Sequence, residues 1–140
     1  MVGTFTGHTR KLNGVAWVGG DRIVSASDDK TLKLWSVADQ RELGTFTGHT
    51  SGVRCVCWLG DHRIASGGED ETVKIWDIET QRCLGTLTGH THSVWCVISL
   101  GDRLDGRFVK TISQSLVCGN THRAYWPCQL CGFIGRRTNC

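Results

Sequence analysis

The sequence lacks any apolar run long enough to cross a membrane. A membrane-spanning helix needs about 20 consecutive apolar residues, and no stretch of the 140 residues approaches that length. No basic segment followed by an apolar one opens the chain as a signal peptide would. We therefore expect a cytoplasmic or nuclear protein that does not associate with membranes.

An excess of charge of one sign is also missing from the first 100 residues, which hold 10 Lys and Arg against 11 Asp and Glu. The net charge of +3 comes from residues 101–140, which hold 6 basic and 2 acidic residues. Electrostatic attraction to nucleic acid or to an anionic membrane would depend on that tail alone. We accordingly predict that neither is a partner.

Helical periodicity is absent from residues 48–77, which instead alternate short β-branched and aromatic runs with Gly and Asp turns. This pattern is typical of consecutive antiparallel strands. A Gly-His pair recurs at His8, His49 and His90, with a period of 41 residues each time. Residues 1–41 match residues 42–82 at 19 of 41 positions, which is far beyond chance. The chain is therefore built from repeats, and the repeat decides the fold.

Each full repeat predicts four strands. In the first they span 12–18, 22–27, 31–35 and 41–47, and the second follows in the same way from 53 to 88. Residues 2–6 have the position of an outermost strand that belongs to a preceding sheet.

The period, the Gly-His pairs, the Asp turns and the strand-ending Trp resemble the WD-repeat family. Trp76-Asp77 matches its Trp-Asp signature in full, and Trp35-Ser36 matches it in part. The resemblance covers residues 1–104 and implies an all-β fold: a partial β-propeller of four-stranded antiparallel blades. A propeller needs about four to eight blades, and a chain with this period holds little more than three, so we expect a ring that this chain does not close.

The resemblance also implies a hydrogen-bond network in each blade, in which an Asp and a Ser bond the Gly-His histidine and a Trp bonds the Ser. Ser25 and Ser27 compete for the Ser role, and the second repeat decides for Ser25, because Ser66 matches Ser25 while Gly68 matches Ser27. The expected sets are His8, Ser25, Asp29 and Trp35, and then His49, Ser66, Asp70 and Trp76. A Ser-His-Asp trio also suggests a hydrolase, but its recurrence at the repeat spacing with a Trp attached favours a structural device and a protein that is not an enzyme.

The cysteines give little reason to expect a metal or any other cofactor. Cys55, Cys57, Cys83 and Cys96 lie at expected strand positions, where a free Cys behaves as a small apolar residue. In the tail, Cys128 and Cys131 have zinc-ligand spacing, with Cys118 and His122 as companions. One such pair is a weak signal, so we predict no metal site.

The third repeat departs from the pattern after residue 104, where five residues that would include the second strand and its Ser are missing. We predict repeats at about 1–41, 42–82 and a truncated 83–104, followed by an irregular tail at 105–140 that is disordered or frameshifted. Codons for residues 117–131, read from their second base, permit CVETLTGHTGPVSC, the expected next Gly-His segment. This reading competes with the zinc module.

We predict a non-enzymatic scaffold or adaptor that binds a protein partner through its loop face. Five positions after each Gly-His histidine, and just before each network Asp, lie the candidate contacts Asn13, Arg54, Trp95, Asp28 and Glu69. The alternative is the substrate-recognition part of an F-box/WD-type ubiquitin ligase complex, where resemblance would make Arg54 a phosphate reader. Glu69 argues against a strong phosphate site, and a solvated loop arginine is the plainer interpretation of Arg54. We also expect self-association, because an open ring leaves sheet faces and edges unpaired.

Overall fold

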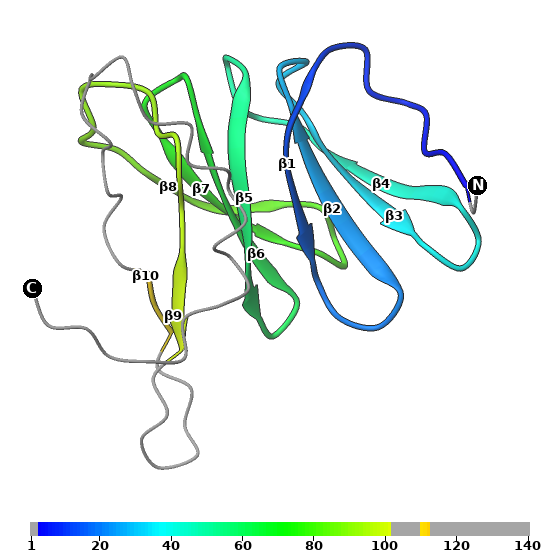
Figure 1. Cartoon of the computed structure of the whole chain (residues 1–140). Helices are drawn as coiled ribbons and strands as arrows, with labels where there is room; N and C mark the ends of the chain where they lie inside the picture. Colours follow the sequence, from blue (N-terminus) through cyan, green and yellow to red (C-terminus); the bar gives the residue numbers. More distant parts are fainter. Residues whose placement is uncertain (1–2, 102–109, 113–140) are drawn as a thin grey trace, which may run out of the picture.

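The computed structural model describes residues 3–101 and 110–112, and all regular structure in that part of the chain is β-strand (Figure 1). The first sheet consists of β1 (Leu12–Trp17), β2 (Arg22–Ser27), β3 (Leu32–Ser36) and β4 (Arg41–Phe46). The second consists of β5 (Val53–Gly60), β6 (Arg63–Gly68), β7 (Val73–Asp77) and β8 (Cys83–Leu87). A short pair follows, β9 (Ser99–Gly101) and β10 (Lys110–Ile112). The predicted strands of the first sheet are confirmed to within one residue at each end.

Both four-stranded sheets are antiparallel meanders in which sequential strands are neighbours. Their registers repeat with the period of the sequence: Val15 pairs with Ser25 in the first sheet, and Val56 pairs with Ser66 in the second. The pairing of third and fourth strands shifts at the residue before the Trp in both sheets. The sequence repeat is therefore a repeat of backbone pairing as well as of residue types.

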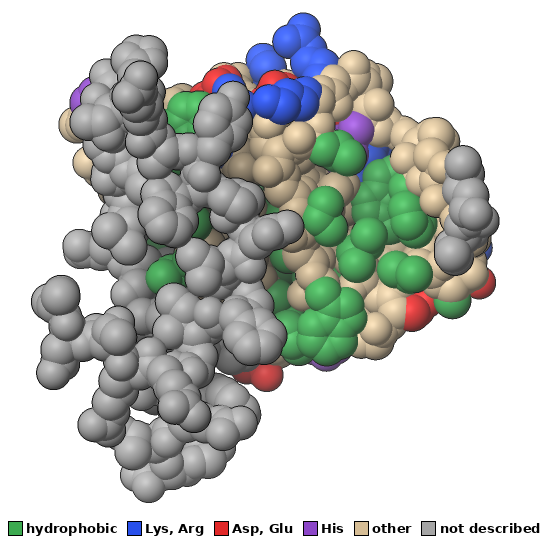
Figure 2. Space-filling view, in the orientation of Figure 1, with side chains coloured by type: hydrophobic (Ala, Val, Ile, Leu, Met, Phe, Trp, Pro, Cys, Tyr) green, Lys and Arg blue, Asp and Glu red, His purple; other side chains and the backbone are tan. Residues whose placement is uncertain are grey.

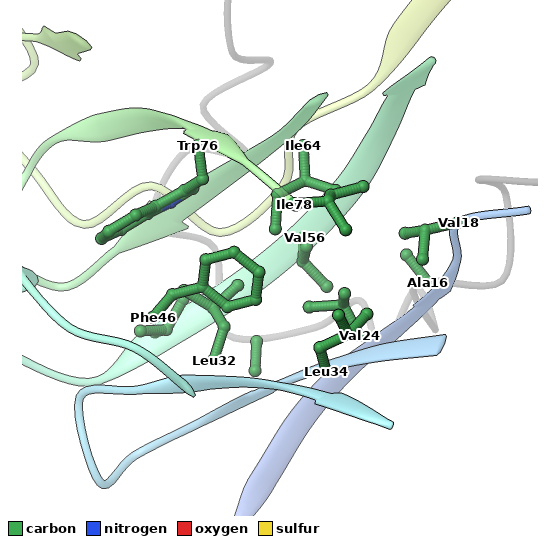
Figure 3. Close-up of a cluster of buried hydrophobic side chains, with 12 residues drawn as sticks. Ala16, Val18, Val24, Leu32, Leu34, Phe46, Val56, Ile64, Trp76 and Ile78 are labelled. Carbon is green, nitrogen blue, oxygen red and sulfur yellow. The ribbon is translucent and has the colours of Figure 1, made fainter. Parts of the chain in front are cut away.

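The main core lies between the two sheets, where apolar side chains of one sheet point toward those of the other (Figure 3). The first sheet contributes Leu32, Leu34 and Phe46 among others, and the second contributes Val56 and Ile64. Phe46 meets Trp76 edge to face, with ring centroids 5.8 Å apart. Burial of such side chains provides most of the folding free energy, at roughly 25 cal/mol per Å² of apolar surface.

A second core lies on the other side of the second sheet. It joins Cys57, Leu59 and Ala65 to Val94 and Val97, which come from the start of the third repeat. Val94 and Val97 stand 41 residues after Val53 and Val56, so they pack on the second sheet from positions equivalent to those from which Val53 and Val56 contact the first. The third repeat therefore continues the stacking before its sequence departs from the pattern.

Two expectations are corrected by the structure. Residues 3–6 form no strand, because among the described residues there is no preceding sheet whose edge could pair with them. Among the cysteines of the described residues, Cys55 and Cys57 are buried, whereas Cys83 is exposed at the start of β8 and Cys96 lies outside any strand. Of the expected tail, residues 110–112 form β10, which pairs with β9.

The two-sheet core predicts a large difference between two leucine substitutions. Leu32→Ala removes a fully buried side chain and is expected to cost about 2–5 kcal/mol of unfolding free energy, as buried Leu→Ala changes do. Leu84→Ala, on exposed strand β8, is the matched control and should stay within about 0.5 kcal/mol. Urea unfolding of both variants measures the difference, and equal losses would contradict the assigned core.

Candidate functional site: the polar network and the loop-face cluster

The Gly-His histidine of each repeat lies at the centre of a buried polar network. His49 Nδ1 is 2.8 Å from Asp70 Oδ2, and its Nε2 is 2.7 Å from Ser66 Oγ. The indole Nε1 of Trp76 donates to the same Ser66 oxygen at 2.7 Å. A neutral imidazole with its proton on Nδ1 satisfies every group: it donates to Asp70, accepts from the Ser66 hydroxyl, and leaves the Ser66 lone pair for Trp76.

The first repeat holds the same arrangement. His8 lies 2.7 Å from both Asp29 Oδ2 and Ser25 Oγ, and Trp35 Nε1 donates to Ser25 at 2.8 Å. The structure thus brings together all eight expected network residues, in two sets of four. Ser27, the rejected candidate, bonds the backbone oxygen of Arg10 instead.

The glycine before each histidine has a steric role. Gly48 has φ of +148°, a backbone conformation that residues with a Cβ rarely adopt, and a Cβ there would lie 3.1 Å from the Trp76 ring. Gly7 repeats this with φ of +157° and a Cβ position 3.0 Å from the Trp35 ring. The Gly-His pair therefore lets the chain run close over the tryptophan while the histidine reaches the serine beneath.

The serine of the second network does not have the access that a nucleophile needs. Ser66 is fully buried, and its oxygen already engages His49 and Trp76. A nucleophile must instead be accessible to substrate beside an oxyanion hole.

Loss of the serine hydroxyl should destabilise the sheet. Ser66→Ala leaves the Trp76 N–H and the His49 Nε2 without their partner in a buried site, and is expected to cost roughly 1–3 kcal/mol. Thr47→Ala, which removes an exposed hydroxyl next to Gly48, is the control and should have little effect. Thermal unfolding compares the two, and a neutral Ser66→Ala would show that the network contributes nothing.

Acid should weaken the two networks at different pH values, the second network through His49 and the first through Asp29. Burial lowers the pKa of His49 from its ordinary 6.5, and this outweighs the opposing effect of Asp70. Below pH 6.5 the unfolded chain therefore binds a proton that the folded chain resists, and stability falls. Burial raises the pKa of Asp29, but hydrogen bonds from Thr31, His8 and the backbone prevail and lower it from 3.8 to about 2. Its contribution to stability is complete above pH 3.8 and is lost between 3.8 and about 2.

Denaturant unfolding across this pH range measures both steps, and His49→Gln should remove the first step while keeping the second. A flat profile below pH 6.5 in the unsubstituted protein would contradict the buried neutral histidine.

The five residues expected at the partner-binding face form one connected cluster, which we name the loop-face cluster: Asn13, Asp28, Arg54, Glu69 and Trp95. Asn13 Nδ2 donates to Asp28 Oδ1 at 2.6 Å and to the Val53 carbonyl at 3.0 Å, which links the two sheets. Arg54 pairs with Asp28 at 3.2 Å and also with Glu69. The Arg54 guanidinium lies over the Trp95 ring, 4.8 Å from its centroid.

Each repeat contributes to this cluster. Asn13 and Arg54 lie in the innermost strands β1 and β5, whereas Asp28 and Glu69 lie in the turns after β2 and β6. Trp95 comes from the third repeat, held where the Val94 backbone N–H donates to the Gly68 carbonyl at 2.9 Å. The hydrogen bond from Arg54 is the main cause that lowers the pKa of Glu69. Glu69 is therefore ionised at neutral pH.

Arg54 is not the solvated loop arginine that the sequence favoured. Only 17% of its side chain is exposed, because two carboxylates and an indole ring surround it. Trp95, in contrast, is 54% exposed. Sequence spacing located these residues, but the pairing of Arg54 with both Asp28 and Glu69 depends on how close the two sheets lie, which no local pattern encodes.

Metal sites find no support in the described residues, where no group of three or more His, Cys, Asp or Glu side chains could hold an ion. The weak zinc candidates Cys118, His122, Cys128 and Cys131 lie outside those residues, as does the segment interpreted as frameshifted. Within the same part of the chain, no helix is long and apolar enough to span a membrane.

The two four-stranded meanders have matching registers and pack face to face. Each contains a Trp-Ser-His-Asp network. These features define a repeat protein of the β-propeller class. The sheets are its blades, and they do not close a ring within the described residues. A family model described as "WD domain, G-beta repeat" matches residues 1–36, 40–77 and 81–109, well over half of the chain. The chain therefore belongs to the WD-repeat family, with two full repeats and a broken third. No curated protein matches it.

Proposed function

We propose that the chain is a non-enzymatic scaffold that binds a protein partner through the loop-face cluster. WD-repeat proteins generally serve as protein-interaction scaffolds. The observation that supports the specific face is the exposed Trp95 ring, positioned by Arg54 at 4.8 Å. A cytoplasmic or nuclear location, as expected from the sequence, is part of the proposal.

The physical case rests on composition and on rigidity. Trp and Arg are enriched among the residues that contribute most binding energy at protein interfaces. Arg54 is fixed by Asp28 and Glu69, and these in turn accept hydrogen bonds from Asn13 and Ser51. A partner that covers Trp95 would therefore lose little conformational entropy on the scaffold side.

The ubiquitin-ligase alternative is not favoured by the geometry. A phosphate-reading arginine needs its fork of N–H donors free for phosphate oxygens. Arg54 already donates to Glu69 and forms an ion pair with Asp28, so two carboxylates outnumber the single cation. A phosphorylated partner would meet two negative charges beside the one positive charge, so we propose a partner that is not read through phosphate.

Trp95→Ala should weaken partner binding and leave folding intact. The ring is exposed, so the free energy of unfolding should change by no more than about 1 kcal/mol. Trp17→Ala is the matched control. It removes another exposed tryptophan, at the end of β1 away from Asn13 and the loop-face cluster. Quantitative affinity capture with the full chain should recover the same partner with the unsubstituted protein and with Trp17→Ala, and at least about tenfold less with Trp95→Ala.

Arg54→Ala should weaken binding as well, with a larger loss of stability than Trp95→Ala, because it leaves Asp28 and Glu69 without their shared cation. If capture is equal for all variants, the loop-face cluster is not the partner site. If Trp95→Ala unfolds the protein, the ring belongs to the core.

A further inference from the structure

We propose that the partner of the loop-face cluster presents a basic side chain, from Lys or Arg, to Trp95 and the carboxylates of Asp28 and Glu69. This inference rests on the proposed function and adds to it the chemistry of the partner. It follows from the charges of the cluster, from the groups that its own contacts leave free, and from a difference in charge between the two full repeats.

The cluster contains one more negative charge than positive charge. Acidic and basic side chains lie side by side at the end of the sheets where β1 and β5 begin, at the top of Figure 2. Within the described residues, the ion pairs of Asp28 and Glu69 all involve the single guanidinium of Arg54. The hydrogen bond from Arg54 lowers the pKa of Glu69, while the charge of Asp28 acts in the opposite direction. The two carboxylates therefore repel each other although Arg54 pairs with both.

Burial of this cluster against a partner would make the charge imbalance unfavourable. In the free chain, water screens the excess charge, because 28% of the Asp28 side chain and 34% of the Glu69 side chain are exposed. A partner that covers Trp95 removes that water, and a carboxylate left without a compensating cation at an interface opposes binding. A partner that supplies one positive charge restores the balance, so the cluster selects for such a partner.

The contacts within the cluster leave free the groups that a basic side chain would use. Asp28 Oδ1 accepts from Asn13 and pairs with Arg54, whereas Asp28 Oδ2 forms no hydrogen bond in the described part of the chain. The Trp95 ring already binds the Arg54 cation and is still 54% exposed. An indole ring attracts cations through its π electrons, and a carboxylate oxygen accepts their N–H groups. Asp28 and Trp95 contact the same guanidinium, so one short partner segment can cover both.

A comparison of the two full repeats places more negative charge on the side of Trp95. The turn after β2 carries Lys30, whereas the turn after β6 carries Glu71 at the equivalent position, and both side chains are exposed. The Gly68 carbonyl accepts from the backbone N–H groups of Glu71 and Val94, at 3.3 and 2.9 Å. The Glu71 turn therefore lies next to the segment that carries Trp95. A basic side chain at Trp95 would meet this acidic turn as well as the cluster.

The test begins with random short peptides displayed on phage and selected on the full chain. Peptides that bind the unsubstituted chain but not Trp95→Ala are sequenced and synthesised, and their dissociation constants are measured by fluorescence anisotropy. We expect each to contain a Lys or Arg whose change to Gln raises the dissociation constant at least about tenfold.

A double-mutant cycle then assigns that basic side chain to the cluster. Asp28→Asn removes one negative charge and leaves Arg54 paired with Glu69, so the cluster becomes neutral. On this variant the change to Gln in the peptide should raise the dissociation constant by less than about threefold. Asp39→Asn is the matched control, because Asp39 is an exposed carboxylate in the turn between β3 and β4, at the opposite end of the first sheet. The tenfold effect should persist there.

Circular dichroism checks that each variant is folded, and Glu69→Gln replaces Asp28→Asn if that chain is not. Peptides that depend on Trp95 but tolerate the loss of every basic residue would overturn the inference and leave the proposed function intact. An undiminished effect of the peptide change on Asp28→Asn would show that the basic side chain binds elsewhere. A chain that retains no Trp95-dependent peptide contradicts the proposed function itself, and this inference with it.

Discussion

The packing of one sheet on the next is the constraint on which the rest of this structure depends. A four-stranded sheet of this size has two apolar faces and cannot bury either one by itself. The first sheet covers one face with the second sheet, and the second sheet covers part of its far side with Val94 and Val97. Residue choice follows from this: Val24, Ala26 and Leu32 on one side face Val56 and Ile64 on the other.

The Trp-Ser-His-Asp network ties the strands of each sheet to one another. The histidine precedes the first strand, the serine lies in the second strand, and the tryptophan lies in the third, so three segments are joined by directional bonds at 2.7–2.8 Å. Asp70 also accepts from the Thr50 and Thr72 backbone N–H groups and thereby stabilises the turn before the third strand. Because every polar group is satisfied, the network adds specificity without leaving a buried group unpaired.

Much of this could be predicted from the sequence, because the repeat provides internal controls. The choice of Ser25 over Ser27 followed from one comparison between copies, and the strand limits followed from alternating runs and turns. The burial of Arg54 could not be predicted, since its contacts with Asp28 and Trp95 depend on how neighbouring repeats stack in space. Residues 3–6 match a strand of the next repeat residue by residue, yet form none, because a strand exists only where another strand pairs with it. Local pattern therefore determines what a segment can become, and its neighbours determine whether it does.

The loop-face cluster is complete although the sequence of the third repeat departs from the pattern after residue 104. Trp95 reaches Arg54 because the third repeat begins normally: the Val94 N–H bonds the Gly68 carbonyl, and the Val94 side chain enters the second core. Within each of the two sheets, a backbone N–H in the turn after the second strand donates to the segment before the first strand, from Glu69 to Gly52 and from Asp28 to Lys11. The cluster consequently needs only the first residues of a repeat, whereas a complete sheet needs all four strands.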